Sequence, residues 1–155
     1  MVGRRDATGL TPAGGLLAAA ALHLGFQAVV TGVVYPALAE VPQDRWAAAH
    51  AAHSRRIGVV VAPVYTLLAA ACARVLVSGP RTPSSLAAVG GAAGAALSTA
   101  FVAAPTHRRL GQGRSPELLA TLRAADRVRL AGAVLAAGAA LRVVHRPPRE
   151  GTRGP

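Results

Sequence analysis

The stretch that decides the fold reads Ile57-Gly-Val-Val-Val-Ala-Pro-Val-Tyr-Thr-Leu-Leu-Ala-Ala-Ala-Cys-Ala-Arg-Val-Leu-Val-Ser78. Arg74 is its only charged residue. A helix needs about 20 apolar residues to cross the roughly 30 Å hydrocarbon core of a bilayer, and this stretch is long enough. Irregular backbone cannot cross hydrocarbon, because its polar groups would lack partners. The stretch therefore predicts a membrane-spanning helix.

Three further apolar runs accompany this one. The four predicted spans cover residues 13–39, 57–78, 85–105 and 118–144, and the first turns of the last one are polar. Residues 1–12 and 147–155 form polar tails. We therefore predict an all-α integral membrane protein, an up-and-down four-helix bundle formed by one domain over residues 1–155. Its expected location is the cell membrane, as a multi-pass protein.

The composition favours helices that pack through small side chains. Apolar residues make up 52% of the 155 residues, yet aromatic residues make up only 3%, and there are 17 glycines. Close helix contact through small residues is typical of membrane bundles. Gly90 and Gly94 form a small-residue repeat in the third run. It predicts packing inside the bundle, with a homodimer contact as the alternative.

The chain is strongly basic, with a formal net charge of +11. In a soluble protein this charge would suggest nucleic acid as a partner. Here the basic residues are arginines in loops and tails, where they meet anionic lipid head groups. No basic patch carries interleaved aromatic residues, so nucleic-acid binding is not expected. The expected partners are the lipid bilayer and a hydrophobic small-molecule substrate, and a homo-oligomer is left open.

Three histidines are expected at one end of the bundle. The predicted connections are a long loop at residues 40–56, a tight turn at 79–84 and a loop at 106–117. An up-and-down topology puts the first and third connections at the same membrane face. His50 and His53 lie in the first, and His107 begins the third.

The first of these loops contains a helical stripe. Trp46, His50, His53 and Ile57 are spaced i, i+4, i+7 and i+11, which places them on one face of a helix. We expect this helix to start near residue 42 and to continue into the second span, with Pro63 bending it. The stripe would face inward or lie along the membrane interface, where Trp is favoured.

Several interpretations of the histidines are open. His50 and His53, three residues apart, can share a metal ion or a polar ligand, with His107 as a third ligand. Copper and zinc are the natural partners of imidazole. Without a metal, a histidine suits the role of a catalytic base, because its pKa lies near operating pH. The plain alternative is that all three are interfacial residues.

A second group of candidates lies within or beside the spans. His23 and Gln27 sit one turn apart near the middle of the first span, where polar residues usually face the bundle interior. They either hydrogen-bond neighbouring helices or bind substrate, and Tyr35 and Trp46 join them as candidate substrate-binding residues. Tyr35 and Tyr65 could also donate protons, although packing is the simpler interpretation of both.

The fourth run starts with a clear helix signal. Ser115 can cap the helix, and Pro116 suits its first position. Asp126 can then pair with Arg123 or Arg129 at three residues' distance. These groups would lie near the histidines. An Asp126–Arg129 pair could orient a histidine or bind an acidic substrate, and an interfacial salt-bridge network is the alternative.

One part of the chain resembles a known family. The segment Phe101-Val-Ala-Ala-Pro105-Thr106-His107-Arg-Arg-Leu110, with Thr99 before it, resembles the third-helix signature of the anthrone-oxygenase-like family. Its members are small four-helix membrane proteins of mostly unknown function. His107 stands where that family commonly has Asn. Asp126 and Arg129 would match a polar residue and an Arg in the following helix of the family.

The resemblance implies an oxygenase that needs neither flavin nor haem and acts on a polycyclic anthrone. Such an enzyme removes a proton from an acidic, electron-rich carbon and lets the carbanion react with oxygen. The leading hypothesis is a small membrane oxidoreductase, cofactor-free or copper-dependent. Its candidate catalytic residues are His50, His53, His107, Asp126 and Arg129. The alternative is a non-catalytic polytopic membrane protein that acts as an accessory subunit or binds lipid.

Overall fold

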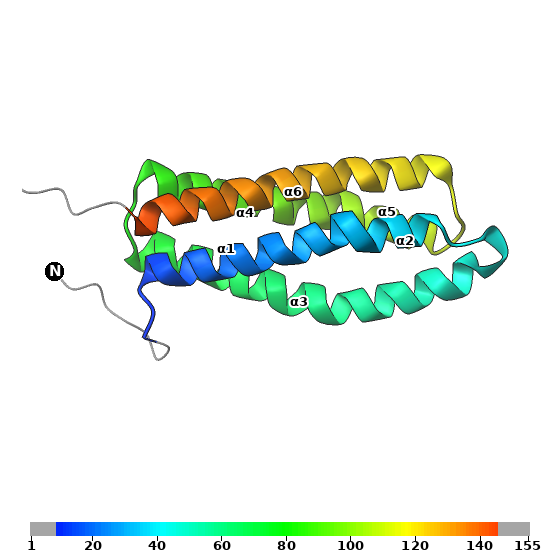
Figure 1. Ribbon diagram of the computed structural model, residues 1–155, viewed down its shortest axis with the longest axis horizontal. Coiled ribbons are helices and arrows are strands. Elements are labelled where there is room, and N and C mark those ends of the chain that lie inside the picture. The colour runs from blue at the N-terminus through cyan, green and yellow to red at the C-terminus, as the bar shows by residue number, and fades with distance from the viewer. Residues whose placement is uncertain (1–8, 146–155) are drawn as a thin grey trace, which may run out of the picture.

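The computed structural model describes residues 9–145. Of the predicted polar tails, only residues 9–12 fall in this range, and the others lie outside the described residues. Residues 9–145 form four long helical stretches joined by short turns, with no strand among them. Figure 1 shows the stretches side by side, running alternately in opposite directions. The all-helical, four-helix arrangement predicted from the sequence is confirmed.

The first stretch consists of α1 (Pro12–Val29), the π-helical segment η1 (Val30–Val34) and α2 (Tyr35–Ala39). The short 3₁₀ turn η2 (Gln43–Arg45) leads into α3 (Trp46–Ser78). The third stretch contains α4 (Pro83–Ser98), the π-helical segment η3 (Thr99–Ala103) and α5 (Ala104–Leu110). The fourth is α6 (Pro116–Val144), which the Ser115 hydroxyl caps by accepting a hydrogen bond from the Leu118 N–H.

The connections predicted at residues 40–56 and 106–117 contain more helix than non-helical chain. Helix resumes at residue 43, and the alanine-rich segment after Trp46 continues it into α3, because alanine has the highest helix propensity. At the other connection, α5 continues to Leu110. His50, His53 and His107 therefore lie on helices, which fixes their directions more tightly than loops would. The expected helix through the Trp46–Ile57 stripe is confirmed.

The four stretches pack as a ring. The first packs against α3 and α6, and α4 packs closely on α6, while the contact between α3 and α4 is slighter. Helix α3 contains Pro63 and is curved along its length (Figure 1). Its backbone stays farther from η3 and α5, so side chains make the contacts between them. The bundle is thus tight on three sides and looser where α3 faces the end of the third stretch.

Both π-helical segments come just before a proline. η1 ends at Val34, ahead of Pro36, and η3 ends at Ala103, ahead of Pro105. Proline has no N–H to donate to the preceding turn. A wider turn accommodates that loss, and such turns often occur at functional sites. Each turn sets the direction of the residues that follow it.

A close approach of two backbones joins α4 to α6. A Cβ atom added at Gly91 would lie 2.6 Å from the carbonyl oxygen of Gly132, so only glycine fits. Gly90 and Gly94 meet nothing within 4 Å. The sequence interpretation that this pair packs inside the bundle is therefore wrong, and the adjacent Gly91 makes the contact. The homodimer alternative for Gly90 and Gly94 stays a prediction.

Three of the helical stretches are long and apolar enough to cross a membrane by length and composition. They cover Pro12–Ala39, Gln43–Ser78 and Pro83–Leu110, and α6 is not among them. Only 17–33% of the residues in their most apolar windows are buried inside the bundle. Large apolar side chains therefore face outward, among them Val59 at 76%, Val77 at 77% and Phe101 at 74% exposure.

Replacing Gly91 with alanine should destabilise the bundle. The new methyl group would press on the Gly132 carbonyl, and overpacking of this kind costs about 1–3 kcal/mol. Thermal unfolding of the detergent-purified protein measures the effect. Gly90→Ala is the matched control and should leave the melting temperature unchanged or slightly raised, because its Cβ meets open space. Equal melting temperatures for the two variants would contradict this account of the α4–α6 contact.

Candidate histidine site in the bundle

Three imidazole rings gather at one end of the bundle, as the sequence predicts. His50 Nε2 lies 3.3 Å from His107 Nδ1, and their rings stack at 5.5 Å between centroids. The His53 ring lies 5.7 Å from that of His107 and 6.4 Å from that of His50. Residues 57 apart in the chain thus share a hydrogen bond. In it, one of the two nitrogens carries the hydrogen and the other accepts it.

Trp46 holds this cluster against the following connection. Its indole N–H donates to the Leu110 carbonyl at 2.9 Å, and its ring stacks on that of His50 at 5.3 Å. The Arg114 guanidinium lies over the Trp46 ring, 5.8 Å from its centroid. Arg114 also donates a hydrogen bond to the Ala39 carbonyl at 2.9 Å. Trp46 is 2% exposed, so it acts as a buried anchor between α3 and the end of α5.

A buried polar network lies beside the histidines. Arg129 donates to an Asp126 carboxylate oxygen at 3.1 Å and to the Tyr35 hydroxyl at 2.5 Å. Gln27 donates to the same carboxylate oxygen at 2.5 Å. All four side chains are buried. The predicted Asp126–Arg129 pair is confirmed, whereas Arg123 is exposed and takes no part in this network.

His23 lies one turn before Gln27 and is fully buried. Neither of its ring nitrogens has a hydrogen-bond partner among the described residues. Its ring meets the Tyr65 ring edge-on, 4.9 Å between centroids. The Tyr65 hydroxyl in turn lies 2.7 Å from the Thr99 hydroxyl. The prediction that His23 and Gln27 face the interior is confirmed, but only Gln27 hydrogen-bonds another helix.

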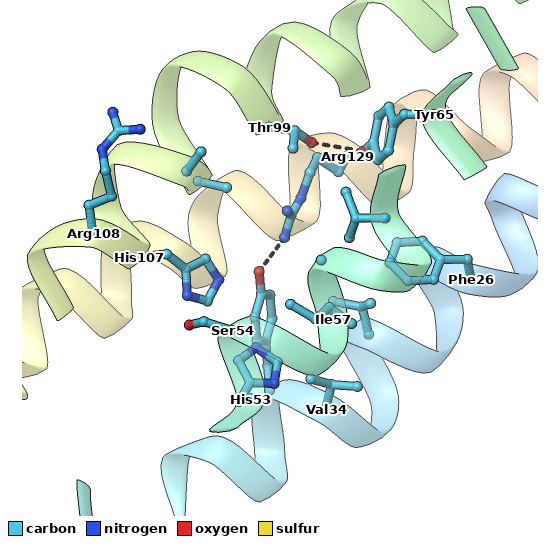
Figure 2. Close-up of a pocket in the computed structure, with 16 residues that line it drawn as sticks. Phe26, Val34, His53, Ser54, Ile57, Tyr65, Thr99, His107, Arg108 and Arg129 are labelled. Carbon is cyan, nitrogen blue, oxygen red and sulfur yellow. Dashed lines mark hydrogen bonds between the residues drawn. The ribbon is translucent and has the colours of Figure 1, made fainter. Parts of the chain in front are cut away.

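A cavity of about 260 Å³ lies between the histidine cluster, the Tyr35–Arg129 pair and Tyr65. Figure 2 shows His53 and His107 on one side of it, Tyr65 and Phe26 on the opposite side, and Arg129 between them. Tyr35, which accepts from Arg129, also lines the cavity. Its polar lining consists of Tyr35, His53, Ser54, Tyr65, Thr99, His107, Arg108 and Arg129. Its apolar lining includes Phe26, Val30, Val34, Ile57, Val61 and Ala103. The cavity lies where the α3 backbone stands away from the third stretch, and exposed residues such as Ser54 and Gly58 take part in its lining.

The charges around the cavity disfavour a fully protonated cluster. Three imidazoles lie within 5.5–6.4 Å of one another, and the Arg129 guanidinium lines the same cavity. Like charges at such distances oppose one another, so three imidazolium groups beside Arg129 would repel each other. A neutral imidazole can accept a proton. The Tyr35 hydroxyl accepts from Arg129, so its own hydrogen is available to a group in the cavity. The arrangement offers a base and a hydrogen-bond donor across one apolar space.

The copper hypothesis stays a prediction. Among residues 9–145, no group of three or more His, Cys, Asp or Glu side chains is arranged to hold a metal ion. The close His50–His107 contact joins these two nitrogens to each other by a hydrogen bond. A metal between them would need the rings to turn.

The sequence missed several residues of the site. Phe26, Ser54 and Thr99 line the cavity, and Arg114 closes the histidine end, but none of them was a candidate. Tyr65 was interpreted mainly as a packing residue, yet it both lines the cavity and contacts His23. Within the apolar runs, no periodic signal separates the residues of a cavity wall from those of a lipid-facing surface. Trp46, predicted to bind substrate, lies behind His50 rather than in the cavity lining.

Comparisons with protein-family models, with curated proteins and with solved structures found no match to this chain. The resemblance to the anthrone-oxygenase-like family therefore stays a prediction from the motif around His107.

Removing one partner of the Asp126–Arg129 pair should destabilise the protein strongly. Asp126→Ala leaves the buried Arg129 charge without its counter-ion, which costs about 3–5 kcal/mol. The double variant Asp126→Leu/Arg129→Met removes both charges and should recover most of the loss. Arg123→Ala, an exposed position on the same helix, is the control and should have almost no effect. A double variant less stable than Asp126→Ala in thermal unfolding would refute this view of the pair.

Proposed function

We propose that this chain is a small, multi-pass membrane oxidoreductase that acts on a hydrophobic substrate in the cavity between α3 and the third stretch. The observation that carries the proposal is the cavity itself. It brings His53 and His107 into the same apolar space as the buried Tyr35–Arg129 pair. Binding sites for small molecules typically combine a mostly apolar lining with a few polar groups that fix orientation.

Insertion in the cell membrane is part of the proposal. Three helical stretches have the length and composition to span a bilayer, and their apolar side chains point outward. We include α6 as a fourth span, because Val128, Val134, Leu135 and Leu141 also expose large apolar side chains. Its charged residues Asp126 and Arg129 are buried in the bundle, where lipid would not meet them. A protein with such an exterior in water would expose apolar patches.

In this proposal, His107 is the base. The hydrogen bond with His50 fixes the His107 ring, and when His107 Nδ1 donates to His50 Nε2, His107 Nε2 is free to take a proton. His53 lies on the same wall and can receive the proton in place of His107. Tyr35, held by Arg129, donates a hydrogen bond to an oxygen of the substrate. Asp126 and Gln27 hold Arg129 in place.

The reaction follows the chemistry that the family resemblance implies. The base removes a proton from an acidic CH₂ carbon, and the carbanion reacts with molecular oxygen. The protonated histidine returns its proton to the peroxide, which loses water and leaves a carbonyl group. The atoms balance as CH₂ + O₂ → C=O + H₂O. Molecular oxygen supplies the oxidising equivalents, so the proposal needs no flavin or haem. In the alternative, copper-dependent form of the proposal, the histidines bind a copper ion.

A second function has support from the same cavity. Its lining is largely apolar and its opening faces the outside of the bundle, so it could hold a hydrophobic molecule without converting it. The chain would then be a non-catalytic lipid-binding or accessory membrane protein. Binding without turnover distinguishes this function from the enzyme.

Replacing His107 should abolish most of the activity. With an anthrone as probe substrate, we expect His107→Ala to lower the rate of oxygen uptake by about 10²–10⁴-fold, the usual contribution of a general base. His50→Ala should have a smaller effect, because it only positions His107. His145→Ala, at the exposed end of α6, is the control. Copper and zinc are measured in the same preparations, and one equivalent of copper lost with His107 would select the metal-dependent variant.

A large side chain added to the cavity wall should block binding. Gly58 lines the cavity, and a Cβ atom there meets nothing within 4 Å, so Gly58→Phe adds a ring without a clash at its Cβ. We expect at least a tenfold loss of affinity for 1-naphthol in detergent micelles, measured by calorimetry, with no loss of stability. Gly25→Phe is the matched control, since that position is also open but lies outside the cavity lining. Equal affinity in both variants would exclude this cavity as the binding site.

A further inference from the structure

The buried imidazole of His23 has a role that the proposed chemistry does not use. It is 0% exposed, and both of its ring nitrogens lack a partner among the described residues. A neutral imidazole has one donor and one acceptor to satisfy. Leaving such groups unpaired in an apolar interior destabilises the folded protein. A plain packing role would be filled better by leucine, so the imidazole points to a polar group that it binds.

His23 lies directly behind the inner wall of the cavity. Its ring contacts Tyr65, which lines the cavity and bonds the Thr99 hydroxyl at 2.7 Å. Figure 2 shows Tyr65 and Phe26 across the cavity from His107. Gln27 Oε1, Arg129 Nε and Arg114 Nε are also buried without a partner among the described residues, but each of these side chains makes a hydrogen bond through another atom. His23 differs from them, because the structure shows no hydrogen bond from either of its ring nitrogens.

The shape of the ligand is indicated by the aromatic residues. The whole chain has only two Phe, two Tyr and one Trp. Phe26, Tyr35 and Tyr65 all line this one cavity. Aromatic side chains favour offset or edge-on contacts with other rings. A concentration of rings in an otherwise aromatic-poor protein suits a flat ring system, and about 260 Å³ suits a small one.

We propose that the cavity binds a flat hydrophobic ring system with an oxygen at each end, and that His23 binds the inner oxygen. The outer oxygen meets Tyr35 and the histidines, and the inner one is a hydroxyl or carbonyl. Tyr65 stands between the cavity and His23, so its ring rotates when such a ligand enters. The rotation breaks the hydrogen bond to Thr99, and the new bond to His23 compensates for it. His23 is then a specificity-determining residue.

This inference rests on the proposed function, because it places the ligand in the same cavity. Two probes distinguish the role of His23 from the proposed function. They are 1-naphthol, with one oxygen, and 1,5-dihydroxynaphthalene, with a second oxygen at the far end. Affinities are measured by calorimetry in detergent micelles. The same measurement on Gly58→Phe, in which the cavity is blocked, gives the signal from probe that partitions into the micelle. We expect the wild-type protein to bind the diol about tenfold more tightly than naphthol, after that correction.

His23→Leu should remove the preference for the diol and leave the affinity for 1-naphthol unchanged. Its melting temperature should stay equal or rise, because the variant removes unpaired polar atoms from the interior. His23→Asn keeps a donor and an acceptor and should retain part of the preference. His145→Leu is the control for the same exchange at an exposed position and should behave like the wild type.

The outcomes separate the two proposals. Failure of the wild type to bind either probe overturns both of them. Equal binding of naphthol and the diol leaves the cavity as a binding site but overturns the role of His23. A diol preference that persists in His23→Leu also overturns it, because the second oxygen is then recognised elsewhere. Equal binding together with a destabilised His23→Leu variant would assign the imidazole to a buried water molecule instead.

Discussion

The arrangement of this protein depends on one ion pair held inside an apolar bundle. Arg129 and Asp126 are both buried on α6, where an unpaired charge would be very costly. Each therefore needs further hydrogen-bonding partners. Gln27 supplies one to the carboxylate and Tyr35 one to the guanidinium, both from the first helical stretch. The pair thus fixes how the first and fourth stretches face each other, and the cavity forms around the atoms it holds.

The two ends of the bundle are built differently. Toward the chain termini, the interior is a dry cluster of small and aliphatic residues that includes Leu16, Leu68 and Val75. Toward the histidines, the core contains Tyr35 and Trp46, and polar groups enter the interior. Close packing at the first end, with the Gly91–Gly132 contact, gives rigidity. It allows the second end to hold a cavity and buried polar atoms that by themselves destabilise a bundle.

The sequence predicts the helices of this structure better than the connections between them. Long apolar runs predict the four helices, and the spacing of Trp46, His50 and His53 predicts their shared face. Up-and-down topology brings His107 to the same end. The helix after Trp46 was expected within the first connection, but the continuation of helix through the polar residues up to Leu110 was not. Loss of apolar character marks the end of a predicted span, but it does not mark the end of a helix.

The cavity could not be predicted for a different reason. Its walls come from seven separate elements, and its volume depends on the curvature of α3 and on the π-helical turns before Pro36 and Pro105. These departures from a straight α-helix leave no periodic trace in the sequence. The Gly90–Gly94 repeat shows the same limit, since a shift of one residue decides whether a glycine meets another helix or open space.

The loose contact between α3 and α5 has a consequence for how the protein would meet its ligand. An opening on the flank of a membrane bundle draws from the bilayer, in which hydrophobic molecules concentrate far above their level in water. Saturation would then follow the mole fraction of ligand in the lipid, and adding inert lipid would dilute it at constant total concentration. Half-saturation values measured in micelles and in vesicles would differ, although the site and its intrinsic affinity are the same.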